Sequence, residues 1–181
     1  VKNIKEIGNL KFAQNDINKK GLSFKLKKFF KSRKTWCAAS THPGEEKICG
    51  VTHLKLLKKF KNLITIIIPR HTHRLDEILN DLKKLNIHTH THSSKKKIDK
   101  KTQIYIVDTY GETKVFFIKY KIVFLGKSLT ADGGQNPLEP ARFNCQIIHG
   151  PNVSNFTELY KLLNQQKIAF KINSQNGLYS K

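Results

Sequence analysis

Short runs of hydrophobic residues alternate with amphipathic segments along most of this chain. The run at 63–68 contains only aliphatic residues and one threonine, which is typical of a central parallel strand buried on both faces. Shorter β-prone runs predict further strands at 35–40, 104–107, 122–125 and 146–149, and a last edge strand at 168–172.

Between these runs, apolar residues recur at helical spacing. In the segment 44–60 every third residue is apolar, and we expect these side chains to form one buried stripe: Ile48, Val51, Leu54, Leu57 and Phe60. Further helices are predicted at 74–85, 112–120, 137–143 and 155–163. Strands that alternate with helices throughout predict an α/β fold with a parallel sheet.

Polar and glycine-containing segments follow four of the predicted strands. These segments are Ser40-Thr41-His42, Pro69-Arg70, Tyr110-Gly111-Glu112 and Asn136-Pro137-Leu138-Glu139. The carboxyl ends of parallel strands meet at one edge of a sheet, and open α/β sheets bind their ligands there. We therefore expect the four segments to lie together at that edge.

The last of these segments has the features of an anion-binding helix start. Gly133 and Gly134 free the backbone, Asn136 is a good helix N-cap, and proline is tolerated in the first turn. The N–H groups of Leu138 and Glu139 could meet an anion, and the Glu139 carboxylate could accept hydrogen bonds from ribose hydroxyls. An arginine at position 70 could hold phosphate oxygens in a bidentate manner.

The net charge of +21 introduces two further classes of partner. Such a charge attracts nucleic acid and anionic membranes alike, although lysine is spread over the whole chain, as in translations of AT-rich genomes. The segment 23–34 interleaves lysines with apolar residues, and it is either a connector helix or a basic amphipathic surface for anionic lipid. The lysine-rich segment 93–101 is predicted to be a solvated loop.

Three alternating histidines, His88, His90 and His92, would share one face of a strand. They are either metal ligands or part of an exposed edge strand or loop. No acidic or cysteine ligand lies nearby in sequence, so we predict no metal site and no cofactor.

Composition limits the remaining possibilities. The 181 residues, of which 38% are hydrophobic, suit one globular domain. No Cys-x-x-Cys pair is present, so Cys37, Cys49 and Cys145 are expected as reduced core thiols. The longest aliphatic run, 63–68, is far too short to span a membrane. The chain has no methionine and starts at Val1, which indicates either a non-standard start codon or part of a longer protein.

Five motifs together resemble one family. They are Gly8-Asn9-Leu10-Lys11-Phe12, the segment 38–46, Pro69-Arg70-His71, the segment 108–112 and the segment 133–140. In order and spacing they resemble the C-terminal half of the 3-deoxy-D-manno-octulosonic acid (Kdo) transferases of glycosyltransferase family 30. The resemblance runs from about residue 8 to about residue 170. It implies a Rossmann-like parallel sheet with helices on both faces, the C-terminal domain of a GT-B glycosyltransferase, at 35–181, preceded by a connector and basic helix at 1–34.

The family resemblance also implies a function. Kdo transferases are inverting enzymes that transfer Kdo from CMP-Kdo to a lipid A precursor (lipid IVA) in lipopolysaccharide assembly, as peripheral proteins at the cytoplasmic face of the inner membrane. The family's CMP-contacting segments correspond to residues that the chain retains: Pro69, Arg70, Tyr110, Gly111, Glu112, Asn136, Pro137, Leu138 and Glu139. Lys11 matches a family lysine that stabilises the transition state. Ser40, Thr41 and His42 could contact the donor or simply cap the following helix.

The chain departs from the family at several positions. Gln135 stands where histidine is usual, Tyr110 where methionine is common, and Lys127 where glycine is usual. The family's general base, a glutamate of the N-terminal half, has no counterpart in these residues. The resemblance therefore implies a domain that binds the donor, with an anionic membrane surface nearby, but does not transfer sugar unaided. The alternatives are a basic nucleic-acid-binding module, for which no recognised motif is present, and a non-functional gene fragment.

Overall fold

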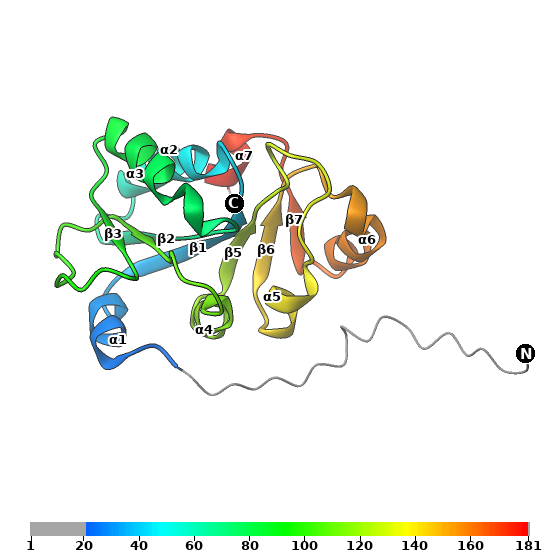
Figure 1. The fold of residues 1–181 in the computed structure, drawn as a ribbon. Coiled ribbons are helices and arrows are strands. Elements are labelled where there is room, and N and C mark those ends of the chain that lie inside the picture. The colour runs from blue at the N-terminus through cyan, green and yellow to red at the C-terminus, as the bar shows by residue number, and fades with distance from the viewer. Residues whose placement is uncertain (1–20, 181) are drawn as a thin grey trace, which may run out of the picture.

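A single parallel sheet organises the protein. The computed structural model describes residues 21–180, and its seven strands follow the order β3-β4-β2-β1-β5-β6-β7 (Figure 1). All neighbouring strands are parallel. The strands are β1 Lys34–Thr41, β2 Leu63–Pro69, β3 Thr89–Thr91, β4 Ile104–Ile106, β5 Ile122–Leu125, β6 Gln146–His149 and β7 Ala169–Lys171.

Helices cover both faces of the sheet, as predicted for a Rossmann-like fold. The helices are α1 Phe24–Phe30, α2 Glu45–Leu57, α3 Leu75–Lys84, α4 Thr113–Lys119, α5 Leu138–Arg142, α6 Thr157–Gln165 and α7 Gln175–Ser180, with short 3₁₀ turns η2 Thr72–Arg74 and η3 Ser154–Phe156. Side chains of α1, α4 and α6 belong to one hydrophobic core, and those of α2, α3 and α7 belong to the other. The predicted fold class is confirmed.

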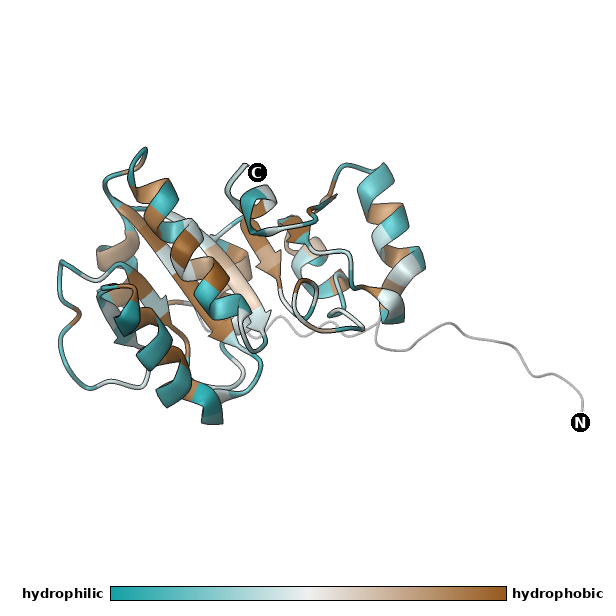
Figure 2. Cartoon of the chain, turned by 90° about the horizontal axis from the view of Figure 1, so that it is seen from above, coloured by the Kyte–Doolittle hydropathy of each residue, from teal (hydrophilic) through white to brown (hydrophobic). Residues whose placement is uncertain are grey.

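The predicted central strand is buried along its whole length. Every residue of β2 is buried between β1 and β4. In Figure 2 the strands are coloured mostly as hydrophobic, whereas the helices carry both hydrophobic and hydrophilic residues. The aliphatic run at 63–68 therefore fixes the centre of the sheet, because both of its faces need apolar cover.

The predicted stripe on α2 is wrong. Ile48, Val51, Leu54 and Leu57 are only half-buried, and the buried residues of the helix after its first turn are Cys49, Gly50, Thr52 and His53. Steps of three residues advance by about 300° around a helix of ~3.6 residues per turn, so a strict three-residue repeat drifts off one face. Small and polar residues therefore contact the sheet, and the larger apolar side chains fill the flanks.

The helix α1 packs onto the sheet rather than standing apart from it. Leu26 and Phe30 are buried in the same core as α4. The ring of Phe30 lies 5.4 Å from that of Tyr105 and 5.5 Å from that of Tyr120. This is the packing expected of a connector helix, and the division of the chain at residue 34 stays a prediction. The C-terminal helix α7 was not predicted.

The histidine run lies on the sheet edge. His90 and the neighbouring threonines form β3, which pairs with β4 and is an edge strand of the sheet within the described residues. His92 Nδ1 lies 2.9 Å from the Tyr105 hydroxyl, and the ring of His90 stacks on that of Tyr105. Within residues 21–180, no group of three or more histidine, cysteine, aspartate or glutamate residues is arranged to hold a metal ion.

The three cysteines are buried and unpaired. Burial raises the pKa of the Cys37 and Cys49 thiols, so both stay protonated and unreactive. Of the helices that the structure describes, none combines the length and the apolar character needed to cross a bilayer.

Candidate functional site

A cavity of about 440 Å³ opens at the carboxyl ends of β1 and β5. At this point the topology of the sheet switches, because β2, β3 and β4 lie on one side of β1 and β5, β6 and β7 lie on the other. Ser40 at the end of β1 and Arg70 just after β2 line it, together with Thr113 and Lys114 at the start of α4. The segment around α5 completes the wall with Gln135, Asn136, Leu138, Glu139, Pro140, Arg142 and Phe143. This is the position at which open α/β sheets bind ligands.

The cavity brings together part of the predicted site. Of the predicted residues, Ser40, Arg70, Asn136, Leu138 and Glu139 line it. The other described candidates are not part of its wall: Pro69, Thr41, His42, Tyr110, Gly111, Glu112 and Pro137. Lys11 lies outside the described residues.

Eight lining residues were not among the predicted site residues: Thr113, Lys114, Phe117, Leu125, Gln135, Pro140, Arg142 and Phe143. Thr113 and Lys114 directly follow the predicted Tyr110-Gly111-Glu112 segment, and Arg142 and Phe143 lie one helical turn beyond Glu139. Helix spacing places Arg142 and Phe143 on the same face as Glu139, but the packing of α4 against α5 decides that this face meets Thr113 and Lys114 at the cavity. Tyr110 itself is 73% exposed, so this segment approaches the cavity through the residues that follow it.

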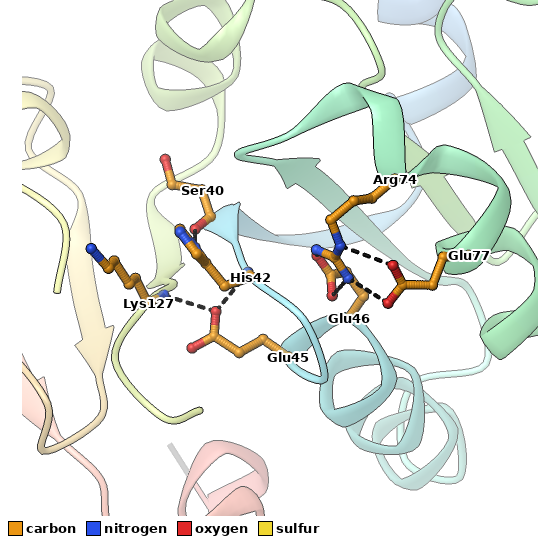
Figure 3. Close-up of polar contacts among 7 residues, drawn as sticks. All are labelled: Ser40, His42, Glu45, Glu46, Arg74, Glu77 and Lys127. Atoms are coloured by element: carbon orange, nitrogen blue, oxygen red, sulfur yellow. Dashed lines mark hydrogen bonds and ion pairs between the residues drawn. The ribbon is translucent and has the colours of Figure 1, made fainter. Parts of the chain in front are cut away.

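A buried carboxylate joins the loop after β1 to the loop after β5. Glu45, in the first turn of α2, is fully buried. Its Oε2 accepts hydrogen bonds from the backbone N–H groups of His42 (3.0 Å) and Lys127 (2.8 Å) (Figure 3). Its Oε1 accepts from those of Ser128 and Leu129, both at 3.0 Å. One side chain therefore holds the loop after β1 against the loop after β5.

The two loops also touch directly. A Cβ atom at Gly126 would lie 2.4 Å from the carbonyl oxygen of Ser40 and 2.6 Å from Oε2 of Glu45. No side chain fits there, which explains the glycine directly after β5. Ser40 has a left-handed backbone with φ of 54°, so its side chain leaves the strand pattern and reaches the cavity wall.

Hydroxyl capping of α2, the alternative role of Ser40 and Thr41, is not what the structure contains. The N-cap residue is Gly44, which makes no side-chain capping bond. The Thr41 hydroxyl is buried, and no residue of 21–180 is its hydrogen-bond partner. Instead, the Glu45 carboxylate, at the first position of the helix, accepts the N–H of His42, two residues before the N-cap.

Hydrogen bonds to two other segments hold the glycine loop at 133–136. The Gly134 N–H donates to the Lys127 carbonyl (3.0 Å), and the Tyr160 hydroxyl of α6 donates to the Gln135 carbonyl (2.9 Å). Burial raises the pKa of Tyr160, so this hydroxyl keeps its proton. Asn136 Oδ1 accepts the Leu138 N–H at 3.0 Å, so this N–H, predicted to meet an anion, is satisfied within the chain.

Positive charge predominates around the cavity. Arg70, Lys114 and Arg142 contribute guanidinium and ammonium groups to the wall, and Glu139 contributes a carboxylate. The pKa of His71, beside Arg70, is lowered by desolvation and by the neighbouring histidines and arginines. A phosphate ester suits such a wall, and Glu139 suits neutral hydroxyls rather than an anion.

A second acidic residue of α2 takes part in a network of ion pairs. Glu46 pairs with Arg74 at 3.0 Å, and Arg74 also pairs with Glu77 at 2.9 Å (Figure 3). The Glu77 hydrogen bond is the main cause that raises the pKa of Arg74. This network ties α2 to α3 outside the cavity.

Lys127 provides a test of the loop geometry. It has φ of 55°, a left-handed conformation that costs a residue with a side chain about 1–2 kcal/mol. We expect Lys127→Gly to raise the free energy of unfolding by up to about 1 kcal/mol, net of the greater unfolded-state entropy of glycine. Lys127→Val should lower it by about 1–2 kcal/mol, because β-branched residues avoid this region. Urea unfolding measures both, and a glycine variant less stable than the parent contradicts the assignment.

A second cavity, of about 430 Å³, lies at the ends of β6 and β7. His149, Tyr160, Asn164 and Lys171 are among its lining residues. His149 Nδ1 lies 2.7 Å from the Gly150 carbonyl and Nε2 lies 3.2 Å from Asn164 Nδ2, so both ring nitrogens have partners. These contacts make His149 a structural residue of the strand end.

Comparisons with known proteins point to one family. The chain is 35% identical over 142 residues to the 3-deoxy-D-manno-octulosonic acid transferase of Haemophilus influenzae, which covers 78% of the chain and 33% of that protein. It is 36% identical over 174 residues to the enzyme of the same name from Rickettsia typhi, which covers 95% of the chain and 37% of that protein. The chain therefore spans about a third of the length of these curated relatives. No family model matches the chain.

One solved structure supports the same relationship. The crystal structure of the C-terminal CMP-Kdo binding domain of WaaA from Acinetobacter baumannii superposes with a TM-score of 0.78 at 28% sequence identity. The match covers 84% of this chain and 79% of that one. The likeness therefore extends over most of both domains.

Proposed function

We propose, for a chain that belongs to the Kdo transferase family and corresponds to the C-terminal part of its members, that the described residues bind CMP-Kdo in the cavity between β1 and β5. The observation that carries this proposal is the convergence of Ser40, Arg70, Asn136 and Glu139 from three separate segments on one cavity wall. The solved domain that the chain resembles is itself named for binding CMP-Kdo.

The chemistry of sugar transfer fits the charges of this wall. The bond between the anomeric carbon of Kdo and the CMP phosphate breaks, and the phosphate leaves with additional negative charge. Arg70, with Lys114 and Arg142 in the same wall, stabilises that charge, and Glu139 accepts hydrogen bonds from the ribose. Lys11 stays a predicted contributor from outside the described residues.

The acceptor side of the reaction is part of the same proposal. An acceptor hydroxyl attacks the anomeric carbon and passes its proton to a base. We assign this base to a part of the protein outside residues 21–180. We assign the acceptor to a lipid A precursor, and the place of reaction to the cytoplasmic face of the inner membrane, where an anionic surface is a partner. Alone, these residues should bind the donor without transferring sugar.

Calorimetric titration with CMP tests the donor site. We expect saturable binding that is tighter for CMP than for UMP or AMP at physiological salt. Arg70→Ala should weaken CMP binding by ~10–100-fold, because it removes charge-assisted hydrogen bonds to the phosphate. The fold should be unaffected, because the Arg70 side chain is exposed.

Two further variants separate a built site from general charge attraction. Lys61→Ala removes one exposed cation from the turn before β2, and it should leave CMP affinity unchanged. Glu139→Ala removes a negative charge, so charge attraction alone predicts tighter CMP binding, whereas the proposed ribose contact predicts weaker binding. Tighter binding by Glu139→Ala, or equal losses in Arg70→Ala and Lys61→Ala, would overturn the site.

A further inference from the structure

Two lysine-rich segments, about seventy residues apart in sequence, meet on one side of the protein. The guanidinium of Arg33, after α1, donates to the carbonyl oxygens of Lys100 (2.6 Å) and Thr102 (3.1 Å). Ile98 of that loop packs against the same hydrophobic core as Phe29 of α1. The loop between β3 and β4 is thereby held beside α1 (Figure 1).

We define the lysine surface as the exposed lysines of these two segments: Lys25, Lys27, Lys28, Lys31, Lys95, Lys96, Lys97, Lys100 and Lys101. Asp99 is the one acidic residue within 24–31 and 95–101. Its carboxylate accepts the Lys101 N–H at 2.8 Å. The positive charge here is thus denser than the average over the chain, which has 34 basic and 13 acidic residues.

An exposed aromatic ring lies within the lysine surface. Phe24, in the first turn of α1, is 81% exposed, whereas Leu26 and Phe30 of the same helix are buried. Their burial fixes the helix on the core and leaves Phe24 among the lysines. A helix with a buried apolar side, a cationic outer side and one protruding aromatic is suited to the headgroup region of a bilayer.

We propose that the lysine surface docks on an anionic phospholipid bilayer, with Phe24 inserted between the headgroups. This inference rests on the proposed function in one respect, the choice of a lipid rather than another polyanion. The observations favour the bilayer over single-stranded nucleic acid, which binds along a groove with several exposed stacking rings. Here Phe30 is buried, and the ring of Phe29 is covered by the Arg33 guanidinium at 4.4 Å.

The lysine surface and the donor cavity lie at opposite edges of the sheet. Arg33 directly precedes β1 and Thr102 lies just before β4, so their hydrogen bond is at the edge where the parallel strands begin. Ser40 and Arg70 of the cavity wall lie where β1 and β2 end. The proposed bilayer contact therefore does not overlap the donor cavity.

Vesicle binding of the 181-residue chain tests this proposal. We expect binding to vesicles of phosphatidylglycerol and phosphatidylcholine, and little binding to phosphatidylcholine alone. The variant Lys25→Gln/Lys27→Gln/Lys28→Gln should bind the anionic vesicles ~30–100-fold more weakly, because each lysine near such a surface contributes several-fold. Phe24→Trp should show a blue shift of its emission on the vesicles, against the buried Trp36 as background.

A matched variant controls for net charge. Lys47→Gln/Lys58→Gln/Lys83→Gln removes three exposed lysines from α2, its C-cap and α3, on the opposite face, and should weaken vesicle binding only a few-fold. The proposal would be overturned if the two triple variants lose equal vesicle affinity, or if the parent does not bind anionic vesicles. It would also be overturned if the protein binds single-stranded RNA through α1 and does not bind vesicles. CMP titration of the α1 variant should match the parent. A protein that docks on vesicles but fails to bind CMP would refute the donor site alone.

Discussion

Glu45→Gln should lower the free energy of unfolding by about 3–5 kcal/mol. Each carboxylate oxygen of Glu45 accepts two backbone N–H groups, and an amide nitrogen in place of either oxygen would face two donors that are at least partly buried. A buried donor that loses a charged acceptor costs on the order of 1–3 kcal/mol, and here two lose it at once. Urea denaturation at pH 7 measures the change.

The same substitution should weaken CMP binding, because the loops that carry Ser40 and Lys127 lose their common anchor. Glu158→Gln is the matched control, since Glu158 lies in the first turn of α6 but is exposed. We expect that variant to stay within about 0.5 kcal/mol of the parent. If Glu45→Gln is as stable as Glu158→Gln, the carboxylate does not hold the loops together.

Acidification should destabilise the protein through His53. This histidine of α2 is buried, and its Nδ1 lies 2.9 Å from the Thr65 hydroxyl of β2. Its Nε2 has no hydrogen-bond partner among the residues that the structure describes. Desolvation lowers its pKa to about 4 from 6.5. The unfolded chain therefore takes up a proton before the folded protein does, and stability is lost as the pH falls from about 6.5 to about 4.

The size of this effect follows from the shift. The full contribution is about 3 kcal/mol, and about 2 kcal/mol of it should be gone at pH 5 relative to pH 7.5. His53→Gln keeps an amide near Thr65 but cannot titrate, so its stability should fall less over the same range. Parallel pH profiles for the two proteins would refute the assignment to His53, because the lowered pKa values of His90 and His149 act equally in both.

The predicted elements came from local patterns, and most of them are present. The aliphatic run at 63–68, the short β-prone runs and the helix signals correspond to β2, to the other predicted strands and to α2–α6. The buried face of α2 was predicted wrongly, because Cys49, Thr52 and His53 do not stand out as apolar. Which face a helix buries depends on its neighbours, and α3 approaches so closely that a Cβ at Gly50 would lie 2.8 Å from Leu82 Cδ2.

The site was predictable where residues directly follow strands. Ser40, Arg70, Asn136, Leu138 and Glu139 share the cavity because parallel strands end at one edge. Lys114 and Arg142 needed the packing of α4 against α5, which no local pattern specifies. The role of Glu45 was also invisible, because three of its four partners lie more than eighty residues away.

The sequence by itself determined the parallel α/β fold, the edge of the sheet at which the cavity lies and the family, since each of these depends on short patterns and their order. Only the tertiary structure decided which of the candidates share a cavity, how Glu45 joins two loops, and that the lysines of α1 lie beside those of the loop before β4. These are contacts between distant segments. They depend on how helices pack on a sheet, and packing is a property of the whole chain.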